Sequence, residues 1–114
     1  MSTTVDPAGT AAVRSRVRSA IARAWRDAEL AGRLPVPDAG APIPEVEVER
    51  PANPAFGDLA TNLGMKLARP LRRPPIAIAE ALAEQLRGEA GAGLVASAEV
   101  APPGFLNLRL TDAA

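Results

Sequence analysis

Phe105, Asn107 and Arg109 stand at alternate positions near the end of the sequence. In an extended strand successive side chains point to opposite faces, so these three would share one face and the leucines at 106, 108 and 110 the other. The leucine face can supply a core, which leaves the first face directed outward. An aromatic ring, an amide and a guanidinium can stack on a base, bond to its edge and pair with a phosphate. The alternative is a solvent-exposed strand face that carries one phenylalanine.

The composition is poor in groups that perform catalysis. The sequence of 114 residues contains no histidine, cysteine or tyrosine. This excludes His-based acid–base catalysis, Ser-His and Cys-His pairs, disulfides and thiolate or imidazole metal sites. Glutamates at 45, 47 and 49 would lie about 7 Å apart on a strand with no further ligand, so we interpret them as a solvent-exposed face. We expect no metal and no cofactor.

Basic residues cluster in two segments although the net charge is zero. This neutrality argues against indiscriminate binding of polyanions. Six arginines lie within residues 14–33, and we interpret them as the exposed surface of a helix. A second group lies in a stretch without acidic residues, and we predict that it contacts backbone phosphates together with Arg109. This second group is Lys66, Arg69, Arg72 and Arg73.

No segment of the sequence has the character of a membrane span or a secretory signal. Runs of 18 apolar residues are absent, and the first residues lack the basic-then-apolar pattern of a signal peptide. A chain without cysteine also suits a reducing compartment. We therefore expect a cytoplasmic protein that does not interact with membranes.

The hydrophobic periodicity predicts one small α+β domain over residues 10–110, with tails at 1–9 and 111–114. We expect three helices packed against an antiparallel sheet of three to four strands. A loop with four prolines occupies residues 34–44. The expected order is helix, strand, helix, helix, strand, strand, at residues 10–31, 45–49, 58–70, 74–87, 94–100 and 105–110.

Individual residues carry more detailed expectations. Thr10 should cap the first helix, Gly32 should end it, and Asp58 should cap the second helix. Trp25 should bury its ring while its indole N–H stays in contact with water. In the first helix the apolar face should run from Val13 to Ala31. In the third helix the buried stripe should be Ile76, Ala79, Leu82, Ala83 and Leu86.

Two motifs together resemble the N-terminal domain of arginyl-tRNA synthetases. The first runs from Glu47 to Asn62 and contains Glu-Arg-Pro, Asn-Pro and Gly-Asp-Leu-Ala-Thr-Asn, and the second is Pro-Gly-Phe-Leu-Asn-Leu at residues 103–108. Their order and spacing cover roughly residues 12–110. The resemblance implies a domain that docks on the corner of arginine tRNA and reads a nucleotide of the D-loop. It assigns that reading to Phe105 and Asn107 and a structural role to Gly57, Asp58, Asn62 and Gly104.

The resemblance also implies that aminoacylation belongs to other domains. Without histidine the chain has no His-Ile-Gly-His-type element, and Lys66 is its only lysine. We therefore expect a tRNA-binding module that supports aminoacylation without catalysing it, and no binding of DNA. One alternative is a protein-interaction module that uses the Phe105 face or the loop at 34–44. A catalyst built from aspartate and glutamate is a third, less favoured hypothesis.

Overall fold

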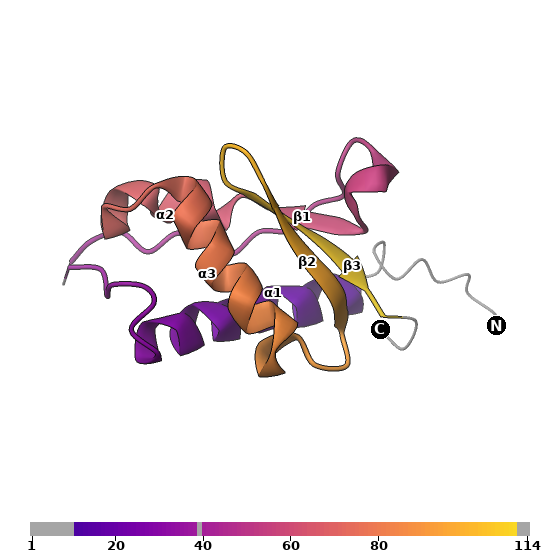
Figure 1. Cartoon of the computed structure of the whole chain (residues 1–114), viewed down its shortest axis with the longest axis horizontal. Coiled ribbons are helices and arrows are strands. Elements are labelled where there is room, and N and C mark those ends of the chain that lie inside the picture. Colours follow the sequence, from indigo (N-terminus) through magenta and orange to yellow (C-terminus); the bar gives the residue numbers. More distant parts are fainter. Residues whose placement is uncertain (1–10, 39, 112–114) are drawn as a thin grey trace.

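The computed structural model describes residues 11–38 and 40–111. This part contains three α-helices, a three-stranded antiparallel sheet and two single 3₁₀ turns (Figure 1). The predicted fold class and order of elements are confirmed. The elements are α1 (Ala11–Leu30), η1 (Pro54–Phe56), β1 (Leu59–Thr61), α2 (Leu63–Leu71), α3 (Pro75–Arg87), η2 (Glu89–Gly91), β2 (Val95–Ala101) and β3 (Phe105–Leu110).

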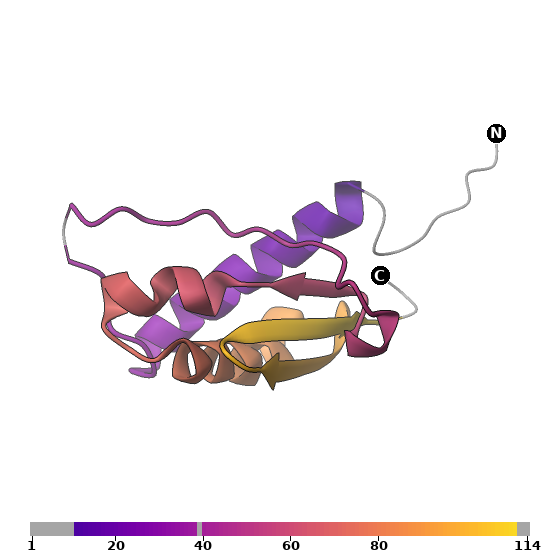
Figure 2. The same cartoon turned by 90° about the horizontal axis from the view of Figure 1, so that it is seen from above.

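Helix α3 is the centre of the helical layer because it packs against α1, α2 and β2 (Figures 1 and 2). The predicted face of α1 is buried from Val13 to Ala28, whereas Ala31 lies beyond the end of the helix and is exposed. In α3 the predicted stripe omitted Ile78, which is fully buried, and included Ile76, which is only half-buried. A helix that contacts three neighbours buries a broader sector than one stripe.

Strand β3 occupies the middle of the sheet, whose order is β1-β3-β2. Because both edges of β3 are paired, its inward leucines lie at the centre of the core. Leu106 and Leu108 are almost completely buried, together with Leu59 from β1. The other large side chains at the centre of the core are Val17, Ile21, Leu63, Leu67, Ile78, Leu82 and Leu86.

The strand predicted over residues 45–49 does not form, and β1 lies instead within the predicted second helix. The segment 45–49 is extended, but only Glu49 pairs, through a single antiparallel bridge to Ala60. Its valines still face the core, with Val48 buried and Val46 packed against the core cluster. Residues Leu59–Thr61 are buried at all three positions, so they show no alternation that would mark a strand. A β1 of three residues offers little edge for a further strand.

Trp25 differs from its prediction in the position of its polar atom. The side chain is half-buried, but the indole Nε1 is enclosed and has no hydrogen-bond partner among the described residues. Trp25 shares a pocket with Val36 and Ile43 of the proline-rich segment, which has no helix or strand. The prediction that the indole N–H stays in contact with water is therefore wrong.

Two further expectations concern the ends of the domain. The tails at 1–9 and 112–114 and the cap at Thr10 lie outside the described residues. Thr111 is still held by the sheet, because its amide donates to the Leu94 carbonyl oxygen at 2.9 Å. Within the described residues, no helix combines the length and the apolar composition that are needed to cross a bilayer.

Candidate functional site

The alternation of β3 places Phe105 and Asn107 on the outer face of the sheet, away from the helices. Leu106, Leu108 and Leu110 are buried on the inner face, as the sequence predicts. Phe105 remains 39% exposed although it is a large apolar ring, and Asn107 is half-buried. An aromatic plane and an amide that offers both a donor and an acceptor therefore lie two residues apart on one surface.

A groove of about 570 Å³ contains both of these side chains. Asn107 pairs with Ala60 of β1, and Ala60 pairs in turn with Glu49, so these residues form one row across the sheet. Ala60 and the half-buried Asn107 both line the groove. This volume lies in the range of typical ligand pockets. The groove is thus a candidate binding site with Asn107 at its centre.

The two ends of the groove come from different parts of the chain. At one end Phe105 and Asn62 line it beside the β2–β3 hairpin. At the other end it is lined by Phe56 of η1 and by Arg50. Figures 1 and 2 show the hairpin and η1 at opposite ends of β1. The sequence motif missed Phe56 and Arg50 as candidates, although Phe56 is one of only three aromatic residues in the chain.

Gly57 and Asp58 fasten the η1 turn to β3. A Cβ atom on Gly57 would lie 2.7 Å from the Leu108 carbonyl oxygen, so only glycine allows this close approach. The Asp58 amide donates to the same oxygen at 2.8 Å. The Asp58 carboxylate then accepts from the Leu110 amide at 2.8 Å. The chain thereby fixes one end of the groove with backbone contacts.

Asp58 is therefore not the cap of the second helix that the sequence suggested. Helix α2 begins only at Leu63, where the Thr61 hydroxyl oxygen accepts from the Leu63 amide at 3.3 Å. Asn62 occupies the N-cap position without a side-chain cap bond. Its side chain is half-buried at the groove, which gives it a place among the candidate binding residues as well as the structural ones.

Gly104 lets the β2–β3 hairpin approach the junction of α2 and α3. A Cβ atom there would lie 2.5 Å from the Pro75 Cβ and 3.2 Å from Cγ of Met65. Because no side chain fits, the residue before Phe105 must be glycine. This contact holds the backbone at the start of β3 against the helical layer, while the Phe105 ring points to the opposite, outer face of the sheet.

Arg109 shares the outer face of β3 but is occupied by the protein itself. Its Nη2 atom donates to the Ala55 carbonyl oxygen at 2.6 Å, within η1. The same turn is closed by a bond from the Ala55 amide to Oδ1 of Asn53 at 2.9 Å. Arg109 is also not among the residues that line the groove. This hydrogen bond suits a role for Arg109 in positioning η1.

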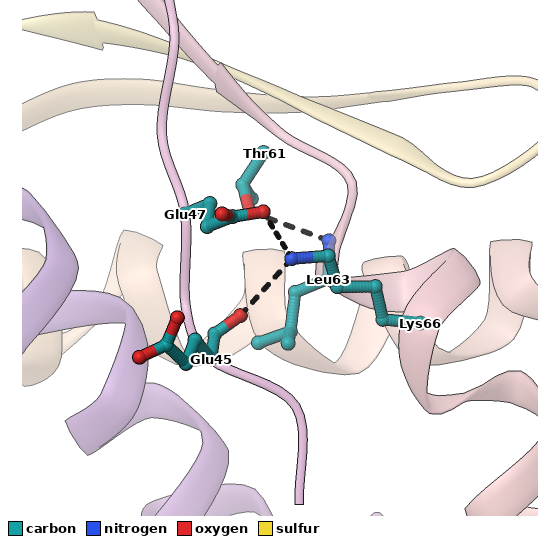
Figure 3. Close-up of polar contacts among 5 residues, drawn as sticks. All are labelled: Glu45, Glu47, Thr61, Leu63 and Lys66. Atoms are coloured by element: carbon teal, nitrogen blue, oxygen red, sulfur yellow. Dashed lines mark hydrogen bonds and ion pairs between the residues drawn. The ribbon is translucent and has the colours of Figure 1, made fainter.

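Lys66 is likewise engaged within the domain (Figure 3). Its ammonium pairs with the carboxylate of Glu47 and donates to the Glu45 carbonyl oxygen at 3.3 Å. The hydrogen bond from Lys66, and secondly its charge, hold the pKa of Glu47 below the ordinary value of a glutamate. These contacts tie the extended segment 45–49 to α2, and they leave the charge of Lys66 partly neutralised.

Three arginines around the end of α2 remain the strongest basic surface near the groove. Arg69, Arg72 and Arg73 are exposed, and none of them has a carboxylate partner within the described part of the chain. Arg72 ends the helix in the left-handed conformation with φ of 55°. Arg69 follows Asn62 by seven residues, so it lies two helical turns, about 10 Å, from that end of the groove.

The described residues contain no group of three or more His, Cys, Asp or Glu side chains that could hold a metal ion. The groove is instead an open surface with aromatic and amide groups, and the charged residues Glu49 and Arg50 also line it. Aromatic, amide and guanidinium groups can bind a flat ring and a nearby anion. The fold and this groove define a small α+β domain with a candidate binding surface on the outer face of its sheet.

Comparison with known proteins gives the family. The family model for the N-terminal domain of arginyl tRNA synthetase matches residues 12–110. An arginine–tRNA ligase of Cereibacter sphaeroides is 54% identical over 83 residues, which cover 73% of this chain and 13% of that protein. One from Paracoccus denitrificans is 48% identical over 98 residues, covering 86% of this chain and 16% of that protein.

A solved structure agrees with these relatives. The arginyl-tRNA synthetase of Thermus thermophilus superposes with a TM-score of 0.59 at 31% identity, over 87% of this chain and 14% of that one. The chain therefore belongs to the family of arginyl-tRNA synthetase N-terminal domains, as its two motifs suggested. It spans only 13 to 16% of the length of the relatives named above.

Proposed function

We propose that this chain is a tRNA-binding module that supports arginyl-tRNA aminoacylation by docking on arginine tRNA and reading one nucleotide of its D-loop. The nucleotide's base stacks on the Phe105 ring, and the amide of Asn107 bonds to its edge. The observation that carries this proposal is that both side chains line one groove on the exposed face of a domain of this family. Stacking of a base on an aromatic ring is worth about 1–3 kcal/mol.

The phosphate contacts of this module fall to Arg69, Arg72 and Arg73. They are exposed and lack a carboxylate partner within the described chain, whereas Lys66 is paired with Glu47 and Arg109 with the η1 backbone. We therefore assign the latter two structural roles rather than the phosphate contacts expected from the sequence. Three phosphate contacts give a slope of log Kd against log salt concentration of roughly 2 to 3.

The test is binding of a fluorescent arginine-tRNA transcript to the chain at several salt concentrations. Phe105→Ala should raise Kd about 5- to 100-fold without changing the salt dependence, because it removes stacking and no charge. Asn107→Asp keeps the shape but replaces the amide donor with an acceptor, so it should also weaken binding. Changing the three arginines to alanine should flatten the salt dependence.

Leu30→Ala is the matched control, since Leu30 is 80% exposed and is not part of the groove. Its Kd should equal that of the wild type. Unchanged binding in Phe105→Ala would remove the reading site from the groove. Absence of any tRNA binding at low salt would overturn the whole proposal.

A second candidate function is a protein-interaction module. The observation in its favour is a pocket of about 400 Å³ beside Trp25, in which Val36 and Ile43 stay 72% and 69% exposed. Apolar side chains that gather on a surface often mark a protein interface. Sedimentation of the chain at rising concentration, with and without tRNA, separates the two functions. Self-association that Val36→Ser abolishes and tRNA does not affect would favour the second.

A further inference from the structure

Phe56 is an exposed aromatic ring that the proposed reading of one base does not use. It is 59% exposed and takes no part in the core cluster, yet it lines the same groove as Phe105. Burying such a ring against a ligand would remove apolar surface from water. Phe56 is the last residue of the 3₁₀ turn η1 (Pro54–Phe56), so this turn presents the ring to the groove.

We propose that Phe56 stacks a second base, so that the groove binds two neighbouring nucleotides with Asn107 between them. This inference rests on the proposed function and extends it from one nucleotide to two. It assigns Phe56 as a nucleotide-binding residue and Arg109 as the residue that positions it. The ligand is a single-stranded RNA segment whose bases are unstacked, as in a tRNA loop.

The spacing of the backbone positions that carry the two rings leaves room for two bases. Gly57, which follows Phe56, lies against the backbone of Leu108, three residues along β3 from Phe105. At about 3.4 Å per residue this places the two attachment points roughly 10 Å apart along the strand. Stacked rings have centroids only about 4.5–7 Å apart. One base on Phe105 therefore leaves the Phe56 end of the groove free for its neighbour.

The volume of the groove and its lining agree with this spacing. The groove has a volume of about 570 Å³ and extends from Phe105 at the hairpin to Phe56 at η1, with Asn107 and Ala60 between them. Asn107 lies two residues from Phe105 and one from Leu108, so its amide is within reach of the edge of either base. Glu49 and Arg50 also line the groove, so its charged lining carries one acid and one base.

The backbone of the η1 turn is held by four hydrogen bonds. Arg109 Nη2 donates to the Ala55 oxygen at 2.6 Å, and the Ala55 amide donates to Asn53 Oδ1 at 2.9 Å. The Phe56 amide donates to the Asn53 oxygen at 2.9 Å, and the Gly57 amide donates to the Pro54 oxygen at 3.1 Å. A turn whose backbone is already fixed loses little backbone entropy when a base binds. Arg109 thus acts on the second base through Phe56, without touching the RNA.

The experiment measures Kd for the chain and a set of arginine-tRNA transcripts, each with one D-loop nucleotide made abasic. An abasic nucleotide keeps its phosphate and loses only its base, so it reports stacking alone. Phe56→Ala should raise Kd for intact tRNA about 5- to 100-fold, and Phe56→Trp should bind as the wild type does. Arg109→Ala should weaken binding in the same direction, but not when Phe56 is already alanine.

The decisive result is the identity of the abasic transcript with which each substitution no longer changes Kd. The effect of Phe105→Ala should vanish with one abasic nucleotide, and that of Phe56→Ala with an adjacent one. Equal urea midpoints of Phe56→Ala and wild type, expected for an exposed ring, exclude a folding defect. Leu30→Ala again provides the control for removal of exposed apolar surface.

Three outcomes would overturn the inference in distinguishable ways. Wild-type Kd in Phe56→Ala, with weakened binding in Phe105→Ala, refutes the second base and leaves the proposed function intact. If both substitutions become silent on the same abasic transcript, one base touches both rings and the two-nucleotide arrangement is wrong. If neither substitution changes Kd, or if the wild type binds no tRNA, the proposed function fails with it.

Discussion

Gly57 has a backbone conformation that a side chain can scarcely adopt, with φ of 132° and ψ of −172°. This region of conformational space is almost restricted to glycine, and a non-glycine residue there costs about 1–3 kcal/mol. A Cβ atom would also lie 2.7 Å from the Leu108 carbonyl oxygen, so the η1 turn would have to move off β3. Such a shift costs a further 1–3 kcal/mol or so. Gly57→Ala should therefore lower the free energy of unfolding by about 2–6 kcal/mol.

Gly32→Ala is the matched control for the conformational part of this cost. Gly32 also has a positive φ, of 75°, but no atom lies within 4 Å of the position that its Cβ would take. It should cost only about 1–2 kcal/mol. With a urea m value of about 2 kcal/mol/M, the midpoint should fall by roughly 1–3 M for Gly57→Ala and by 0.5–1 M for Gly32→Ala. The urea unfolding of both variants is measured by circular dichroism. Equal midpoints for Gly57→Ala and Gly32→Ala would refute the close approach of η1 to β3.

Two further substitutions test contacts away from the groove. Lys66→Met should return the pKa of Glu47 to that of an ordinary glutamate, as measured by an NMR titration. In the native protein the ion pair stabilises the fold at pH values above the pKa of an ordinary glutamate, and this stabilisation is lost as the pH falls through the lowered pKa of Glu47. An unchanged Glu47 titration in the variant would contradict the pairing. Trp25→Phe removes the enclosed Nε1–H together with part of the packed ring, so its urea midpoint should fall much less than that of Trp25→Ala. Equal falls in the two variants would contradict an unpaired N–H.

Local patterns were sufficient for the elements whose periodicity is unambiguous. The alternation at 105–110 correctly gave a strand with leucines inward, because a central strand with one buried face must follow a period of two. Helical spacing correctly gave α1 and α3, and the predicted range 74–87 of the third helix differs from Pro75–Arg87 by one residue. These signals depend on residues that are near one another in the chain.

Other elements could not be read locally because they depend on distant partners. Asp58 has the side chain of a helix cap, but its carboxylate accepts from Leu110, 52 residues away. Glu45 to Glu49 alternate like a strand, but only Glu49 finds a strand edge to pair with. Lys66 resembles a free cation on a helix until Glu47 is placed beside it. In each case the partner, whether a backbone group or a charge, is distant in the sequence and is brought close only by the tertiary structure.

The sequence by itself determined that Phe105 and Asn107 share an outward face, since alternation in a strand needs no other information. Tertiary structure alone decided that Phe56 lies in the same groove as Phe105, 49 positions later in the chain. The physical reason is the packing of Gly57 and Asp58 against Leu108 and Leu110, which brings the η1 turn to the sheet. Periodicity describes a single element, whereas a groove exists only where separate elements meet.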